Sequence, residues 1–148
     1  MRAEIVCELG DMELKKIEYR DLNARQKENY NFQKISALLA DYGFATIRLS
    51  DDWNGADFLA LHVDGITTLK IQLKPRLTFG KKYMGKDLWI CFPSGRDWYL
   101  YPHDKLLETV LSETMVGASQ SWIEAGLYSF NRLGKNATSW LKAHRIRG

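Results

Sequence analysis

Cysteine and histidine are scarce in this chain, and their scarcity excludes several kinds of site. The two cysteines, Cys7 and Cys91, stand far apart in 148 residues. They are too few for a disulfide framework or a cysteine-based zinc site. The three histidines, His62, His103 and His144, show no metal-ligand spacing and no acidic partner motif. We therefore expect them to be structural or exposed.

Long apolar runs and phosphate-loop motifs are also lacking. No stretch is long enough to span a bilayer. The first residues, Met1 to Glu4, include an early acid and no apolar signal region follows, which predicts a cytoplasmic protein without membrane contact. There is no P-loop, dinucleotide fingerprint or nucleophile elbow.

The composition is that of one globular domain. Hydrophobic residues make up 45% of the chain, with five Trp and seven Tyr, which excludes a disordered protein. A chain of this length can bury a core of its own. We predict a single domain over residues 1–148, with its core at about 21–115 and a helical extension at about 116–148.

Positive charge is modest in total but clustered. The net charge is only +3, which permits nucleic-acid binding without requiring it. Basic residues gather in the middle of the chain and at its end, as expected for a surface that contacts phosphates. An ordinary solvated surface would also account for them. The two groups are Lys70, Lys74, Arg76, Lys81, Lys82 and Lys86, and Arg132, Lys135, Lys142, Arg145 and Arg147.

Hydrophobic periodicity predicts a helix followed by five strands and further helices. The helix covers about 21–42, and Phe44–Leu49 is predicted to be a strand before a turn at 51–55. Strands are expected near 56–63 and 66–74, then a loop at 75–87 and a hairpin of 88–92 with 98–101. A helix begins at His103 or Asp104, with Asp104 as a candidate N-cap, and one or two more follow. This order predicts an α/β (α+β) domain with a mixed sheet of about five strands.

The most informative pattern is an acid and a Gln-x-Lys on neighbouring strands. Asp57 opens the run Ala56–Leu61, an Asp-Gly turn follows at Asp64, and Gln72 and Lys74 close the next run. Residues two apart on a strand share a face, so a hairpin can bring Gln72 and Lys74 beside Asp57. A carboxylate, an amide oxygen and an ammonium at one place suit metal-assisted phosphodiester hydrolysis. Taken singly, Asp57 also fits a turn residue, and Gln72 and Lys74 fit the polar side of a half-buried strand.

Glu28 is the fourth candidate, from the helix. It shares one helical face with Phe32, Ile35 and Leu39. A carboxylate on a core-facing stripe is costly unless it is paired, bound to a metal or open to water at the helix end. A site residue and a solvated residue near the helix start are equally compatible with this position.

In combination, these residues resemble the PD-(D/E)XK nuclease superfamily. Its pattern is a helix with a Glu, a strand that starts with Asp and a strand that ends in Glu-x-Lys. Glu28, Asp57 and the run Gln72-Leu73-Lys74 match it in order. The run Leu38–Phe44 is similar to the entry into the first strand in the resolvase-like branch. The resemblance covers about Asn23 to Arg76 and implies a restriction-endonuclease-like core.

The chain departs from the family pattern in two places. Most members have an acid at the position of Gln72, whereas some homing endonucleases carry Gln there, as this chain does. An amide oxygen still binds a hard cation, but more weakly than a carboxylate does. The family also places a helix after the Glu-x-Lys strand, whereas residues 75–87 predict a loop or a brief turn.

The resemblance implies a metal-dependent endonuclease that hydrolyses DNA. Asp57 and Gln72, with Glu28 through water, would hold Mg²⁺ or Mn²⁺, and Lys74 would orient the attacking water. The partner would be DNA, contacted by Arg76, Lys81, Lys82 and Lys86, and cutting both strands favours a homodimer. Two alternatives remain open: a nuclease-fold protein without catalysis that binds nucleic acid or a protein, and an interaction domain in which these charges form surface ion pairs.

Overall fold

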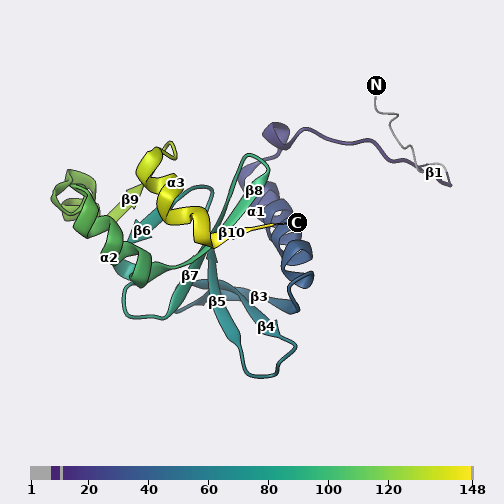
Figure 1. Ribbon diagram of the computed structural model, residues 1–148. Helices are drawn as coiled ribbons and strands as arrows, with labels where there is room; N and C mark the ends of the chain where they lie inside the picture. The colour runs from purple at the N-terminus through teal and green to yellow at the C-terminus, as the bar shows by residue number, and fades with distance from the viewer. Residues whose placement is uncertain (1–7, 11, 148) are drawn as a thin grey trace.

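A six-stranded mixed sheet forms the centre of the computed structural model, which describes residues 8–10 and 12–147 (Figure 1). The strand order is β10-β8-β7-β5-β4-β3, with β5 and β7 parallel and the other neighbours antiparallel. The predictions made for Met1–Glu4 and for Cys7 lie outside the described residues. The strands of this sheet are β3 (Phe44–Trp53), β4 (Ala56–His62), β5 (Thr68–Leu73), β7 (Leu88–Ser94), β8 (Asp97–Pro102) and β10 (Arg145–Ile146).

The long helix α1 (Ala24–Ala40) is defined at its start by a capping box. Asn23 accepts a hydrogen bond from the backbone of Gln26, and the Gln26 side chain accepts one from Asn23, so two backbone donors are satisfied. Ile35 and Leu39 are buried, as the apolar stripe predicted. Asn31 is buried as well, and its amide donates to the hydroxyl of Tyr19, which begins a 3-10 turn at Tyr19–Asp21. The turn at Tyr19–Asp21 is thereby attached to α1.

Strands β3, β4 and β5 form a meander that sets the register of the candidate site. Phe58 on β4 pairs with Ile71 on β5. The predicted turn at 51–55 was too long, because β3 continues to Trp53 and only Asn54 and Gly55 turn, both with positive φ. Pairing between β3 and β4 is irregular between Arg48 and Trp53, and this bulge accommodates the extra residues.

The parallel pairing of β5 with β7 requires a crossover, and residues 74–87 supply it without an α-helix. The crossover holds the short strand β6 (Thr78–Gly80) and a 3-10 turn at Lys81–Tyr83, so the expected loop with a brief turn is correct apart from β6. β6 pairs with β9 (Leu127–Ser129) in a two-stranded sheet. The crossover is thereby anchored to the C-terminal part of the chain.

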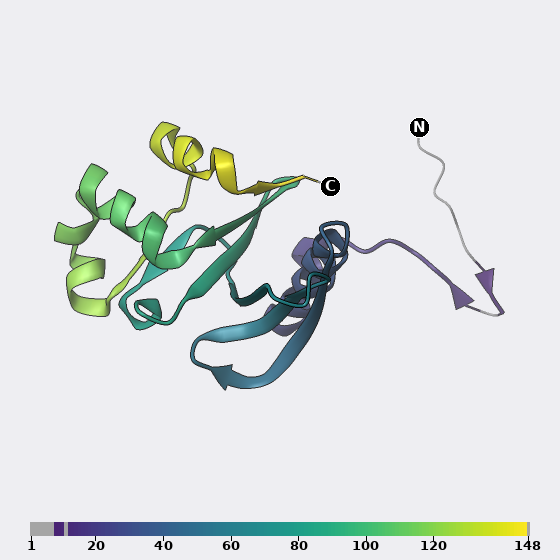
Figure 2. The same ribbon diagram turned by 60° about the horizontal axis from the view of Figure 1, so that its bottom comes forward.

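The two faces of the sheet bury two separate apolar clusters, and β7 contributes to both. Cys91 packs with Ile35 and Leu39 under α1, whereas Ile90 and Phe92 pack with α2 (His103–Glu113) on the other side. Figure 2 shows α1 and α2 on opposite sides of the strands. Because both faces are covered, β7 is almost continuously apolar.

The C-terminal third is not only helical, contrary to the predicted extension. It contains a 3-10 turn at Val116–Ala118, a π-helical turn at Ser121–Ala125, α3 (Lys135–Leu141), a 3-10 turn at Lys142–His144, and the strands β9 and β10. The predicted N-cap at Asp104 is also wrong. Pro102 precedes α2 without a side-chain cap, and Asp104 lies in the first turn, where it accepts a hydrogen bond from the backbone of Gly85.

The predicted fold class is confirmed: an α/β domain with a mixed central sheet flanked by helices. A separate two-stranded ribbon, β1 (Glu8–Leu9) with β2 (Met12–Glu13), precedes this core. Within the described residues, no helix is long and apolar enough to cross a membrane.

Candidate active site

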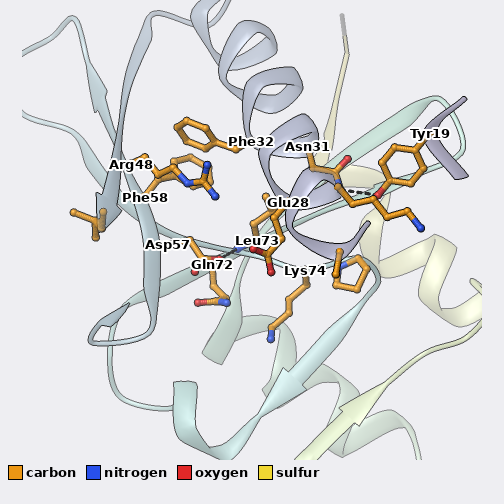
Figure 3. Close-up of a pocket in the computed structure, with 14 residues that line it drawn as sticks. Tyr19, Glu28, Asn31, Phe32, Arg48, Asp57, Phe58, Gln72, Leu73 and Lys74 are labelled. Atoms are coloured by element: carbon orange, nitrogen blue, oxygen red, sulfur yellow. Dashed lines mark hydrogen bonds between the residues drawn. The ribbon is translucent and has the colours of Figure 1, made fainter. Parts of the chain in front are cut away.

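A cavity of about 430 Å³ lies where α1 meets the ends of β4 and β5 (Figure 3). Glu28, Asp57, Gln72 and Lys74 all line it. Glu28 comes from α1, which is distant in sequence from the β4–β5 hairpin that supplies the other three. The labelled side chains of Glu28, Asp57 and Gln72 gather in Figure 3, with Lys74 beside them. The structure therefore brings the four predicted residues to one cavity, while their role as a site stays a prediction.

Asp57 is held in place by the backbone of the neighbouring strand. Its Oδ2 accepts a hydrogen bond at 2.8 Å from the N–H of Leu73, the residue between Gln72 and Lys74. One step beyond the Phe58–Ile71 pair, the antiparallel register brings Asp57 alongside Gln72. The side chain is half-buried, so the carboxylate is fixed and still lies at the edge of the cavity.

Lys74 lies one residue past the end of β5 but continues its pairing with β7. Its backbone N–H donates to Cys91 O at 2.9 Å, which keeps Lys74 aligned with β7 and on the same face as Gln72. The Lys74 Nζ lies 5.4 Å from the ring centroid of Tyr83, a buried residue of the crossover. This cation–π contact restricts the ammonium near the cavity.

Glu28 sits in the second turn of α1 and is exposed. It lines the cavity, but the core stripe passes through Asn31, Ile35 and Leu39 rather than through Glu28. Its carboxylate therefore has both water access and a place at the cavity. The sequence left open whether Glu28 is a solvated residue near the helix start or a residue of the site, and its position is compatible with both.

Two cationic residues at the cavity were not singled out from the sequence. Lys27 lines it next to Glu28, and Arg48 reaches it from β3. The Arg48 guanidinium lies 5.2 Å from the Phe32 ring centroid and donates to the side chain of Asn29. An Arg on an alternating strand gives no sign of this role, because only the packing of β3 against α1 brings it to the cavity.

The crossover residues predicted to bind DNA do not line the cavity. Arg76 donates to Asn131 Oδ1 at 2.7 Å, and the Nζ atoms of Lys81 and Lys82 lie over the rings of Trp122 and Tyr83. The carbonyl of Lys86 accepts a hydrogen bond from Lys70 Nζ at 2.6 Å. Contact between these four residues and DNA stays a prediction.

The donors around the cavity fit a hard divalent cation by chemistry. Asp57 and Glu28 offer carboxylate oxygens and Gln72 offers an amide oxygen, which are the ligand types that Mg²⁺ prefers. In the part of the chain that the structure describes, no group of three His, Cys, Asp or Glu side chains is arranged to hold a metal. Gln72 is therefore required to complete a three-oxygen set at this place.

Hydrogen bonds to His103 and Asp104 anchor the crossover to the start of α2. His103 is fully buried: its Nε2 accepts from the backbone N–H of Gly80 at 3.1 Å, and its Nδ1 lies 2.8 Å from Asp104 Oδ1. Burial lowers the pKa of His103 despite the adjacent Asp104. Burial raises the pKa of Asp104, but hydrogen bonds from His103 and from Gly85 N–H outweigh this effect and keep that pKa below its usual value. The expectation that the histidines lack an acidic partner is therefore wrong for His103, because the first turn of α2 places Asp104 beside its ring.

Among known proteins, no family model and no curated protein matches this chain. Among solved structures, it is similar to Hjc, a Holliday junction resolvase from the archaeal hyperthermophile Archaeoglobus fulgidus. The identity is 18% and the TM-score 0.43, over 53% of this chain and 74% of that chain. Any function assigned to the cavity must therefore rest on the cavity's own geometry.

Proposed function

We propose that this protein is a metal-dependent endonuclease that hydrolyses DNA phosphodiester bonds. The observation that carries the proposal is the convergence of Glu28, Asp57, Gln72 and Lys74 on one cavity. The hydrogen bond from Leu73 N–H to Asp57 Oδ2 joins the acid directly to the Gln-x-Lys strand. The same residues carry the resemblance to PD-(D/E)XK nucleases.

Asp57 and Gln72 are the proposed direct ligands of Mg²⁺, and Glu28 acts on it through water. When bound, the ion supplies Lewis-acid polarisation of the scissile phosphate and increases the acidity of the attacking water. The Leu73 N–H fixes the direction of the Asp57 carboxylate, so little reorganisation is needed when a ligand arrives. Gln72 contributes oxygen without charge, which keeps the site less anionic than a site with a third acid.

Lys74 is the proposed catalytic cation. Its ammonium orients the attacking water and stabilises the negative charge that develops on the phosphate. The Tyr83 ring beneath it limits the positions of Nζ. Lys27 and Arg48 line the same cavity and are proposed to contact the phosphate groups of the bound strand.

The test is DNA cleavage with Mg²⁺ or Mn²⁺, with and without chelator. Asp57→Asn retains an acceptor for the Leu73 N–H but removes the charge, and Lys74→Ala removes the ammonium. Each is expected to lower kcat by about 10²–10³-fold while the protein stays folded, as for the loss of one preorganised transition-state contact. Asp41→Asn and Lys105→Ala are matched controls, since neither residue lines the cavity.

Cleavage that survives both variants, or that chelation leaves intact, would refute the proposal. The alternative is a nuclease-fold protein that binds nucleic acid or a protein partner without catalysis, and Gln72 in place of an acid favours it. Calorimetric titration with Mn²⁺ separates the two. Metal binding that Asp57→Asn abolishes supports the nuclease, whereas no heat of binding supports the alternative.

A homodimer is part of the same proposal. Each chain contributes one cavity of this kind, and cutting both strands of a duplex requires two sites. Sedimentation of the protein with and without duplex DNA gives the oligomeric state directly.

A further inference from the structure

A second hollow, of about 530 Å³, lies between α1 and the C-terminal end of the chain. We name it the basic groove. Four of its lining side chains are cationic, one is acidic and one is an indole: Lys34, Arg96, Arg145, Arg147, Asp97 and Trp98. It shares no residue with the candidate active site.

Tertiary structure alone assembles the basic groove. β10 pairs with β8, which brings Arg145 opposite Tyr99 and Ile146 opposite Trp98. The next residue, Arg147, donates its backbone N–H to the hydroxyl of Tyr42 at 3.1 Å, just beyond the end of α1. Figure 1 shows the C-terminal segment arriving beside α1. Cations from three distant parts of the sequence therefore face one hollow.

The positive charge of the basic groove is poorly neutralised. The single acid, Asp97, lies 3.9 Å from Arg145 Nε, and both side chains are more than a third exposed, so this pair contributes little. Among the ion pairs of the described residues, none includes Lys34, Arg96 or Arg147. Repulsion among like charges at one place is a cost that a polyanionic ligand would relieve.

The basic groove continues the line of the active-site cavity along α1. Lys27 lines the cavity and Lys34 lines the groove. Seven residues separate them, which is two helical turns or about 10 Å along the axis, on nearly one face. That spacing corresponds to about three base-pair steps of duplex DNA. A polynucleotide held at the cavity can therefore extend to the groove without leaving α1.

We infer that the basic groove binds the phosphate backbone of duplex DNA beside the bond that the cavity cuts. The inference rests on the proposed function, since the cavity defines where the DNA lies. Arg96 and Arg147 contact phosphates there, and Lys34 links the groove to the cavity. The competing explanation is that the cations only protect the edge strand β10 from pairing with another chain.

The experiment measures affinity for a fluorescent duplex at several salt concentrations with chelator present, so that binding is independent of cleavage. The test variant is Arg96→Ala with Arg147→Ala. The control, Lys16→Ala with Lys105→Ala, removes the same charge from exposed residues outside both hollows and outside the two basic clusters. Loss of two phosphate contacts should lower the slope of log affinity against log salt by about 1.8. Between 50 and 200 mM salt, the wild-type protein should then lose about 12-fold more affinity than the test variant.

The outcomes separate the groove from the catalytic proposal. A lower slope in the test variant alone, with cleavage at saturating DNA unchanged, supports the inference. Equal slopes in the test variant, the control and the wild-type protein overturn it and leave the nuclease proposal intact. Binding that depends on the groove in a wild-type protein without cleavage supports the groove and refutes the nuclease. Displacement of the duplex by polyglutamate at equal charge concentration would overturn the inference, because the groove would then fit acidic proteins as well as it fits DNA.

Discussion

Replacing Gln72 by Glu is the sharpest perturbation of the candidate site, because it changes one amide into a carboxylate beside Asp57. Neighbouring side chains across an antiparallel pair lie about 5 Å apart at Cβ. Two carboxylates at that separation repel by about 1 kcal/mol in a water-like environment and by about 3 kcal/mol at an effective dielectric constant of 20. Both residues are half-buried, so the repulsion falls between these limits. A divalent cation bound by both carboxylates would make the replacement of Gln72 by Glu stabilising instead of destabilising.

Thermal unfolding of wild-type protein and Gln72→Glu, in chelator and in Mg²⁺, measures this reversal. For a domain of this size, 1 kcal/mol corresponds to about 2–4 °C in Tm. In chelator, Gln72→Glu should therefore unfold about 2–12 °C below the wild-type protein. In Mg²⁺ the difference should close or change sign, and calorimetry should show metal affinity increased by about tenfold, because an anionic oxygen replaces a neutral one.

Gln33→Glu is the matched control, since Gln33 is exposed on α1 and does not line the candidate site. The difference in Tm between Gln33→Glu and the wild-type protein should be the same in chelator and in Mg²⁺. If Gln72→Glu behaves like this control, with the same deficit in both conditions and unchanged metal affinity, Gln72 is not a metal ligand. The proposed three-oxygen set would then be wrong, even if the protein cleaves DNA.

Two further predictions concern the crossover between β5 and β7. The pKa of His103 is lowered by burial, so between that folded pKa and about 6.5 the unfolded chain binds more protons and stability falls as the pH falls. Denaturant unfolding from pH 5 to 8 should show this dependence of the free energy of unfolding on pH. In His103→Leu the pH dependence should fall to the part that His144 contributes. The free energy of unfolding of this variant at pH 8 should be about 1–3 kcal/mol lower, because the Gly80 N–H loses its acceptor. Lys81→Ala with Lys82→Ala should lower the salt slope of duplex binding by about 1.8 without altering sequence preference, and an unchanged slope would remove these residues from the DNA-binding surface.

Local pattern was sufficient where the chain folds back on its near neighbours. Alternation over β4 and β5 and the turn between them predicted that Asp57 would lie beside Gln72, and helical spacing located α1. Both depend on periodicity and on contacts of short sequence separation. The turn before β4 was predicted too long because its polar residues resemble a loop, whereas in the structure they continue β3 through a bulge.

Composition and local pattern limit the possible chemistry. Cysteine and histidine are scarce, and one acid, one amide and one lysine fall on adjacent predicted strands. Tertiary structure decided which other groups share the space. It brought Arg48 from β3 to the cavity, buried Tyr83 beneath Lys74, and added β10 at the far edge of the sheet to form the basic groove. These contacts join residues far apart in the chain, and their pairing depends on how whole elements pack. No local periodicity encodes such packing.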